Sequence, residues 1–274
     1  MGSYVMGDPA VGLRGWLHAR AEQRLFSDDW HGISLESVAR EAGLPCDQVA
    51  NEHFYRALYR RWKNASFASD DEWIAAKKRI ADLMAESLVR YAVPTPRVLS
   101  VGAGLGLIEG YLLDAGWSVE LQECQGESLD RFRSDSRTRV WIGADLRELP
   151  SNTFDAVLSI SMAYALSLAG YRALLVDCAR ILRPGGVLIV WDHDVRIGFS
   201  TLRGRLRGRR LLFWGWLRTP RLHAALAEAA GFRTERIRYF DTRLTPVPPP
   251  IRIAGLQWPL GRSLAQELTF TRPA

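Results

Sequence analysis

Residues 97–106, RVLSVGAGLG, decide how the rest of the chain is interpreted. An apolar run that ends in alternating glycines predicts a buried parallel strand entering a tight turn, with a helix over Ile108 to Asp114 behind it. Glycine suits such a turn because a Cβ would hold a ligand away from the backbone and because the turn can require a positive φ. A ligand in this turn would face the free N–H groups of a helix terminus.

A second strand is predicted directly after this helix. Residues 116–123, GWSVELQE, end in an acid, and Glu123 lies 21 residues after Gly102. This is near the place where a Rossmann-type sheet carries the carboxylate that accepts hydrogen bonds from ribose hydroxyls. The alternative is that Glu123 is a solvated charge at the start of a helix.

Three further motifs follow in order: GADL at 143–146, FDAVLSI at 154–160 and ILRPGGVLIV at 181–190. With the glycine turn and Glu123, they make residues 95–274 resemble the class I S-adenosylmethionine-dependent methyltransferase family, in its small-molecule, type 11-like branch. The resemblance implies an α/β fold with a doubly wound, mostly parallel, Rossmann-like sheet of seven strands, the last of them reversed. It also implies S-adenosyl-L-methionine as the methyl donor.

The resemblance also assigns residues to the cofactor. They occupy the glycine turn and the ends of the second, third and fourth strands, and are Ser100, Gly102, Ala103, Gly104, Glu123, Asp145, Leu146 and Ser161. In the family, the acid after the third strand accepts from the adenine amine, and the next backbone N–H meets the ring. Asp145 and Leu146 match these two positions, although Asp145 is also a typical cap for a short turn.

One position departs from the family pattern. Two residues before the first glycine the family usually carries Asp or Glu, and this chain carries Ser100. A carboxylate that organises the ammonium end of the cofactor is therefore missing, so binding is weaker or another group holds the ammonium. A nicotinamide cofactor fits less well, because the dinucleotide pattern wants glycine where the chain has Leu107.

The fifth predicted strand, Val187 to Trp191, ends in Asp192-His193-Asp194. Methyl transfer is an in-line displacement that needs a base only when the acceptor must lose a proton. Histidine is the natural base near neutral pH, so His193 is the catalytic candidate. The alternatives are a structural histidine or a metal cluster, and three adjacent residues on a strand end point in different directions, which disfavours a metal.

Residues 203–221 are rich in arginine around the apolar run LLFWGWL. Between the fifth strand and the next helix the family often inserts an acceptor-binding element, here about residues 198–222. Arginine and tryptophan beside an apolar run favour a small or amphiphilic, anionic acceptor, or peripheral contact of Arg203 to Arg221 with an anionic membrane surface. A solvated basic helix is the alternative.

Apolar spacing predicts helices from Leu13 to Phe26, Leu35 to Ala42, Val49 to Trp62 and Trp73 to Tyr91. Residues 1–95 are thus expected to form an all-helical cap, lid or dimerisation region, with the methyltransferase domain over 96–274. Tyr55, Tyr59 and Trp62 share one helix face. Such a stripe commonly belongs to a core, but the family resemblance implies that Tyr55 and Tyr59 cover the cofactor and exclude water.

Residues 34–49 resemble a helix-turn-helix, with Gly43 in the turn. They raise a hypothesis of another class, a DNA-binding or ligand-sensing regulator that joins this motif to a Rossmann-like half. The second helix would bring Asp47, Gln48 and Glu52 to the groove, where acids are repelled by phosphate. Nucleic acid is therefore not the expected partner, and a helical pair for packing or homodimer formation is favoured.

Composition limits the class of protein. The 274 residues are 47% hydrophobic and carry a formal net charge of +6, as expected for a globular protein with a sizeable core. No apolar run approaches the roughly 20 residues that span a bilayer, and the start does not resemble a signal peptide. Three cysteines without Cys-x-x-Cys spacing indicate neither disulfides nor zinc. A cytoplasmic protein is expected.

Overall fold

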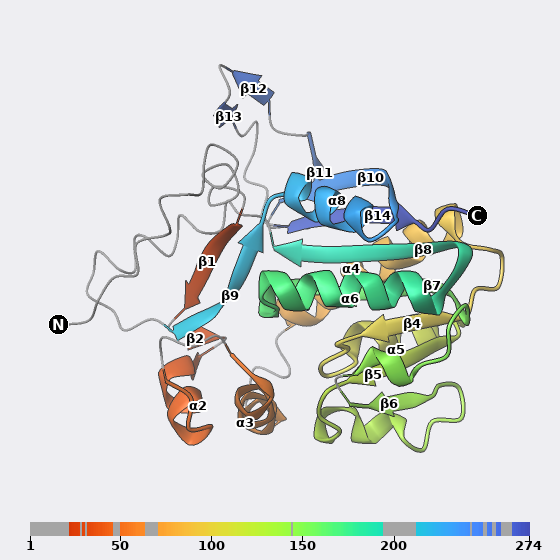
Figure 1. The fold of residues 1–274 in the computed structure, drawn as a ribbon. Helices are drawn as coiled ribbons and strands as arrows, with labels where there is room; N and C mark the ends of the chain where they lie inside the picture. Colours follow the sequence, from red (N-terminus) through yellow and green to blue (C-terminus); the bar gives the residue numbers. More distant parts are fainter. Residues whose placement is uncertain are drawn as a thin grey trace.

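The fold is taken from a computed structural model of residues 1–274. It describes residues 22–27, 29–30, 32–45, 50–63, 71–143, 145–193, 212–241, 243–248, 251–253, 256–258 and 265–274. Within these ranges the elements form one large sheet, three small two-stranded sheets and the helices that cover them (Figure 1).

The large sheet has the order β11-β10-β14-β8-β7-β4-β5-β6. Five neighbouring strands are parallel, namely β6 (Val140–Ile142), β5 (Val119–Glu123), β4 (Val98–Val101), β7 (Phe154–Ile160) and β8 (Leu182–His193). Three antiparallel strands complete it, namely β14 (Ala265–Thr271), β10 (Arg233–Phe240) and the two-residue β11 (Pro246–Val247). The predicted doubly wound, mostly parallel sheet with a reversed last strand is confirmed, but the two-residue β11 makes it eight strands instead of the predicted seven.

The centre of the sheet is β4, the strand that carries the glycine turn. Ser100 on β4 lies opposite Leu121 on β5 and Leu158 on β7. The chain runs outward from β4 to β5 and β6 on one side and to β7 and β8 on the other. Such a reversal of strand order leaves a crevice at the carboxyl ends of the strands, which is where open α/β sheets bind ligands.

Each face of the sheet is covered by helices. On one face, α4 (Asp71–Tyr91) and α5 (Leu107–Asp114) pack through buried residues such as Leu83 and Leu112. On the other face lie α6 (Leu168–Ile181) and α8 (Pro220–Ala229), with the short η3 (Leu146–Glu148). Figure 1 shows α6 and α8 in front of the strands. Because both faces are buried, β4 and β5 are buried along their whole length.

The fifth strand, predicted over Val187 to Trp191, begins earlier in the structure. Helix α6 ends at Ile181, and Leu182 to Gly186 already belong to β8. Backbone hydrogen bonds explain this, because Gly185 N–H donates to Arg272 O and Arg272 N–H donates to Gly186 O. Pairing with the end of the chain therefore makes residues before Val187 part of the strand.

The prediction of a helix up to Phe26 is wrong where the structure describes it. Residues Glu22–Ser27 form β1, which pairs antiparallel with β9 (Leu212–Arg218), and residues 13–21 lie outside the described ranges. A second pair, β2 (Asp29–Trp30) and β3 (Ile33–Ser34), follows around Gly32, whose φ is +81°. The region before α4 therefore contains helices, as expected, but is not all-helical.

Two N-terminal helices, α2 (Leu35–Glu41) and α3 (Glu52–Lys63), share a third core with Tyr164, Leu105 and Leu107. Ser34 caps α2 by accepting a hydrogen bond from Ser37 N–H. The helix predicted over Val49 to Trp62 runs over Glu52–Lys63, and residues 46–49 lie outside the described ranges. The shared core places these helices beside the glycine turn.

The remaining pieces are small. The strands β12 (Ile251–Ile253) and β13 (Leu256–Trp258) form a hairpin, and two 3-10 helices, η2 (Glu127–Phe132) and η4 (Ala163–Ala165), follow β5 and β7. Among the helices that the structure describes, none is long and apolar enough to cross a membrane.

Candidate functional site

The glycine turn after β4 is held by β5. Gly102 N–H donates to Gln122 Oε1 at 3.1 Å, Ala103 N–H donates to Gln122 O at 3.0 Å, and Gly104 N–H donates to Glu123 Oε2 at 2.7 Å. Gly102 and Gly104 have φ of +67° and +59°, which L side chains rarely adopt. Local sequence thus forces the turn, and β5 fixes its position.

Glu123 is buried at the end of β5, so it is not the solvated charge of the alternative interpretation. Its Oε1 accepts from Cys124 N–H at 2.8 Å and from the Cys124 thiol at 2.9 Å. Among the described residues, Oε2 accepts from Gly104 alone. A carboxylate offers about four acceptor positions, so Glu123 keeps capacity for one more donor beside the turn.

Gln122 has a role that the sequence does not reveal. Besides receiving Gly102 N–H, its Nε2 donates to Gly143 O at the end of β6. One side chain therefore joins the first turn to the third strand of the site. A glutamine within a predicted strand carries no recognisable signal for this function.

Ser100 and Glu109 meet beneath the turn. Ser100 is fully buried in β4, and its hydroxyl donates to Oε1 of Glu109, on α5, at 2.6 Å. Burial raises the pKa of the Glu109 carboxyl, while the Ser100 hydrogen bond and the Lys77 ammonium act in the opposite direction. A single buried carboxylate on α5 thus lies at the strand position where the family pattern has its acid.

Tyrosines from α3 lie above the turn. A Cβ at Gly104 would be 3.0 Å from the Tyr59 hydroxyl, and the ring centroids of Tyr55 and Tyr59 are 5.9 Å apart. Burial raises the pKa of both phenols, and Tyr164 and Glu123 add to the effect. The two tyrosines are therefore neutral and close to the turn, as expected for residues that cover it. Tyr164, after β7, joins them and was not singled out from the sequence.

Asp145 and Leu146 lie at the end of β6. Asp145 caps η3 by accepting from Arg147 N–H at 2.9 Å, and its carboxylate pairs with the Arg147 guanidinium. Hydrogen bonds from Arg147 lower the pKa of Asp145 to about 2. Leu146 is buried against the sheet. The capping function of Asp145 is thus present, and its carboxylate stays ionised and partly exposed.

Ser161 and His193 lie at the ends of neighbouring strands. Ser161 has a φ of +52°, and its N–H donates to Trp191 O at 2.7 Å. The ring of His193 is 5.2 Å from the ring of Tyr164. Burial, with a smaller effect of the Lys77 ammonium, lowers the pKa of His193 to about 4. His193 is therefore neutral at pH 7 and able to accept a proton.

Asp192 does not join His193 in one acid-base group. It points to the opposite face, where its Oδ2 is 3.7 Å from Nε2 of His223 on α8, and both side chains are fully buried. Nδ1 of His223 is 2.8 Å from the Tyr171 hydroxyl. Burial raises the pKa of Asp192 to about 7 and lowers that of His223 to about 3. Asp194 lies outside the described ranges.

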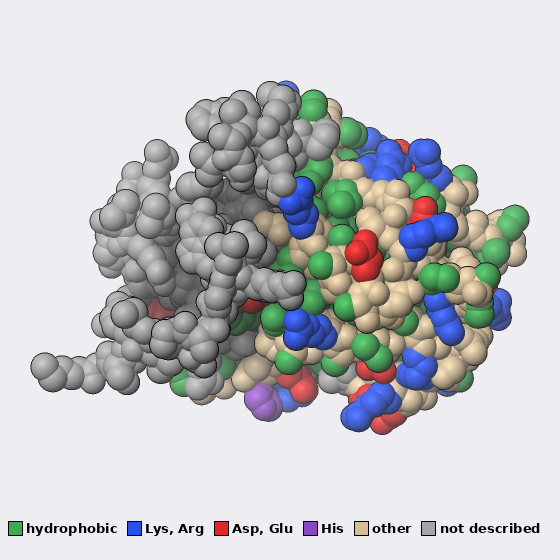
Figure 2. All heavy atoms as spheres, turned by 45° about the horizontal axis from the view of Figure 1, so that its top comes forward, with side chains coloured by type: hydrophobic (Ala, Val, Ile, Leu, Met, Phe, Trp, Pro, Cys, Tyr) green, Lys and Arg blue, Asp and Glu red, His purple; other side chains and the backbone are tan. Residues whose placement is uncertain are grey.

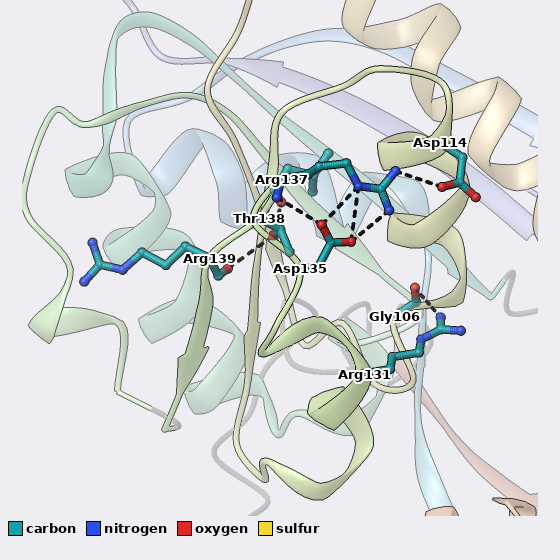
Figure 3. A network of polar contacts seen from close by, with 8 residues as sticks. Gly106, Asp114, Arg131, Asp135, Arg137, Thr138 and Arg139 are labelled. Carbon is teal, nitrogen blue, oxygen red and sulfur yellow. Dashed lines mark hydrogen bonds and ion pairs between the residues drawn. The ribbon is translucent and has the colours of Figure 1, made fainter.

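Two arginines contact the two ends of α5, the helix that follows the glycine turn (Figure 3). Arg131, on η2, donates to Gly106 O at 2.9 Å. Arg137 donates to Asp114, at the end of α5, at 3.0 Å, and pairs with Asp135. These contacts fix the start and the end of α5 relative to the segment that follows β5.

The arginines of α3 are paired with acids: Arg56 pairs with Glu52, Arg60 with Glu127 and Arg61 with Glu41. Figure 2 shows the Lys and Arg side chains of one face scattered among apolar and acidic ones. The predicted basic stretch is mostly outside the described residues, which resume at Leu212. No described group of His, Cys, Asp and Glu could hold a metal ion.

Comparison with known proteins agrees with this geometry. Residues 99–190 match the family described as "Methyltransferase domain". No curated protein matches the chain. Solved structures with a similar fold include the 1,6-didemethyltoxoflavin-N1-methyltransferase of Burkholderia thailandensis with bound S-adenosylhomocysteine, at 18% identity and TM-score 0.53, covering 83% of this chain and 92% of that one.

Two more solved structures have comparable similarity. An S-adenosylmethionine-dependent methyltransferase from Thermotoga maritima has 17% identity and a TM-score of 0.53, with 80% of this chain and 97% of that chain covered. The CcbJ methyltransferase from Streptomyces caelestis has 16% identity and a TM-score of 0.52, with 72% and 90% covered. At these identities the likeness concerns the fold.

Proposed function

We propose that the chain, whose residues 99–190 match a methyltransferase domain, is an S-adenosylmethionine-dependent enzyme that methylates a small or amphiphilic acceptor at the carboxyl edge of the sheet. The observation that carries the proposal is the pairing of the glycine turn with Glu123, through Gly104 N–H at 2.7 Å. This hydrogen bond places the Glu123 carboxylate, a hydrogen-bond acceptor, beside a glycine-rich turn. The adenosine of the cofactor requires both features.

The residues present fit the cofactor. Glu123 has acceptor capacity left for a ribose hydroxyl, and the ionised Asp145 is available to the adenine amine beside Leu146 N–H. Gly102 and Gly104 present backbone alone and Ala103 adds only a methyl group, with Ser100 on β4 and Ser161 directly after β7. Tyr55 and Tyr59 exclude water from the turn. When bound, the cofactor supplies an electrophilic methyl group.

His193 is proposed as the proton acceptor for an acceptor atom that loses a proton on methylation. Its lowered pKa of about 4 leaves it unprotonated at pH 7. Such a weak base assists only when the proton becomes acidic as the new bond forms, so most of the rate comes from holding donor and acceptor in line. Replacing His193 by Ala should therefore lower kcat and leave the affinity for S-adenosylhomocysteine near its original value.

The direct test is calorimetry with S-adenosylmethionine, S-adenosylhomocysteine and NAD. We expect the first two to bind and NAD to fail. Glu123→Ala should weaken S-adenosylhomocysteine binding by about 1 to 3 kcal/mol, the usual cost of losing a charged acceptor. Glu148→Ala, a change at an exposed acid, serves as the control. Equal affinity in parent and Glu123→Ala would contradict the assignment of the ribose site.

The stretch Arg203 to Arg221 is proposed to recognise the acceptor or an anionic surface that holds it. It follows the strand that bears His193, whereas the proposed adenosine contacts lie on β4, β5 and β6. Replacing Arg205, Arg207 and Arg209 by Gln should reduce binding to anionic vesicles, with a smaller difference at high salt. Unchanged vesicle binding would leave this stretch as a solvated basic segment.

Residues 1–95 are proposed as a cap on residues 96–274 that serves as the lid of the site and as the contact of a homodimer. Support comes from the core that α2 and α3 share with Tyr164. Light scattering behind size-exclusion chromatography tests the dimer. A monomer at all concentrations would leave the lid function alone.

A further inference from the structure

The family acid at the end of the first strand is replaced by Ser100, yet a carboxylate is present at this place. Glu109 reaches back from α5, and its Oε1 receives the Ser100 hydroxyl at 2.6 Å. Both side chains are buried, at 0% and 2% exposure. The hydroxyl fixes the orientation of the carboxylate at the strand end, two residues before the first glycine of the turn.

A cation lies near this carboxylate. Lys77 is partly buried on α4, which packs on the same face of the sheet as α5, and its Nζ lies 5.3 Å from the centre of the Trp73 ring. Its charge acts on both Glu109 and His193. Among the described residues, Lys77 has no acid within the distance of an ion pair. A buried acid on α5 and a partly buried ammonium on α4 thus lie on one face of the sheet, close enough to His193 for the charge of Lys77 to act on it.

A carboxylate that is removed from water without a cationic partner is costly, and burial alone does not explain why Glu109 is kept here. The amino-acid end of the cofactor is itself a zwitterion, with an ammonium and a carboxylate on one carbon. Such a ligand would satisfy both protein charges at once.

We propose that Glu109, oriented by Ser100, binds the ammonium of the cofactor's amino-acid end, and that Lys77 binds its carboxylate. The proposal rests on the proposed function, since it concerns the same cofactor. The carboxylate that the family carries on the first strand is then supplied by the following helix. The site therefore has this carboxylate despite Ser100.

The test uses two ligands that differ in this end only. S-adenosylhomocysteine carries the ammonium and the carboxylate, whereas 5′-methylthioadenosine has the same nucleoside and sulfur without them. In calorimetry, Glu109→Gln and Lys77→Met should each weaken S-adenosylhomocysteine binding by about 10- to 100-fold, as for the loss of a charged hydrogen bond. The affinity for 5′-methylthioadenosine should stay within about twofold.

Two further variants separate binding from folding. Asp82→Asn removes an exposed acid from α4, which packs beside α5, and should change neither affinity. Ser100→Asp combined with Glu109→Gln returns the acid to β4 and should recover most of the lost S-adenosylhomocysteine affinity. A thermal unfolding curve of each variant shows whether it is folded at the temperature of the titration.

The outcomes are distinct. If the parent binds neither ligand, the proposed function fails. If the parent binds both and Glu109→Gln binds S-adenosylhomocysteine as tightly as the parent does, only this inference fails. Equal losses for both ligands would also overturn it, because they would mean that Glu109 supports the turn and does not touch the amino-acid end.

Discussion

At the scale of single residues, the site combines glycines at positive φ with buried ionisable groups. Gly104 has a positive φ and lies under the Tyr59 hydroxyl, while Glu109 and Asp192 are carboxyls removed from water on opposite faces of the sheet. The backbone conformation of Gly104 follows from local sequence. The pKa values of the two acids follow from helices that the fold brings over them.

Replacing Gly104 by Ala should weaken cofactor binding more than it harms stability. Ala at a φ of +59° costs about 1 to 2 kcal/mol of unfolding free energy, and its Cβ lies 3.0 Å from the Tyr59 hydroxyl. Gly43→Ala is the matched control, because its φ is +64° with nothing within 4 Å. Urea unfolding should find similar losses for both variants, whereas calorimetry should find weaker S-adenosylhomocysteine binding for Gly104→Ala only.

Replacing Asp192 by Asn should stabilise the protein at alkaline pH. The folded pKa of Asp192 is raised to about 7 from 3.8, so its favourable contribution is present below pH 4 and is lost as pH rises through 7. The neutral Asn lacks this loss. Its Oδ1 can still accept His193 N–H, as Asp192 does at 2.8 Å.

Urea unfolding from pH 4 to 9 measures this effect. The advantage of Asp192→Asn over the parent should grow from about pH 4 to pH 7, reach the order of 1 to 4 kcal/mol, and then level off. Glu148→Gln, at an exposed acid, should follow the parent at every pH. An advantage that is largest at pH 4 would contradict the raised pKa of Asp192.

At the scale of elements, a buried arginine, Arg218, joins the ribbon of β1 and β9 to η4, and Gln266 Nε2 of β14 donates to Arg218 O at 2.8 Å. Arg218 is fully buried and donates to Glu22 at 2.6 Å, to Ala163 O at 2.7 Å and to Leu166 O at 2.6 Å. Gly215 of β9 packs directly on the backbone of Tyr164. The ribbon is thereby held against η4, next to the tyrosine that contacts His193.

Arg218→Met should destabilise the protein by about 3 to 5 kcal/mol, because it leaves Glu22 and two carbonyls without their donor. Arg221→Met, three residues later on the exposed start of α8, should change the unfolding free energy by less than about 0.5 kcal/mol. Chemical denaturation measures the unfolding free energies of the two variants and of the parent. A small loss for Arg218→Met would mean that packing, and not this arginine, attaches the ribbon.

At the scale of the whole molecule, the proposed cofactor site is formed by two parts of the chain that are far apart in sequence. One is the turn of β4 with α5, and the other is α3, whose Tyr59 hydroxyl packs directly on the turn. The third core joins α3 to Leu105 and Leu107 of the turn region. Closing this arrangement over a ligand should order both parts together.

S-adenosylhomocysteine should therefore slow hydrogen exchange in α3 as well as in residues 98–114. At 100 times its dissociation constant it should add about 2.7 kcal/mol to the unfolding free energy. Mass spectrometry of exchange with and without ligand measures both segments, and β10, far from the turn in the sheet order, is the internal reference. Protection confined to residues 98–114 would leave α3 without a function as lid.

Whether a feature of the fold or the site could be predicted from the sequence depends on how far apart in the chain the residues that form it lie. The glycine turn, the acid Glu123 and the order of strands carry local signals, because a turn with positive φ needs glycine and a buried parallel strand needs a continuous apolar run. With the family resemblance, these signals predicted the sheet. They also placed Glu123, Ser161 and His193 at the carboxyl edge.

The tertiary structure alone decided the rest. Glu22 to Ser27 has an apolar spacing that fits a helix, but pairing with residues 212–218 makes it a strand. Glu109 looks like an ordinary helix charge until α5 packs on β4 and brings its carboxylate to Ser100. Both depend on partners distant in sequence or on another element, and no local pattern of residues records which surface will cover them.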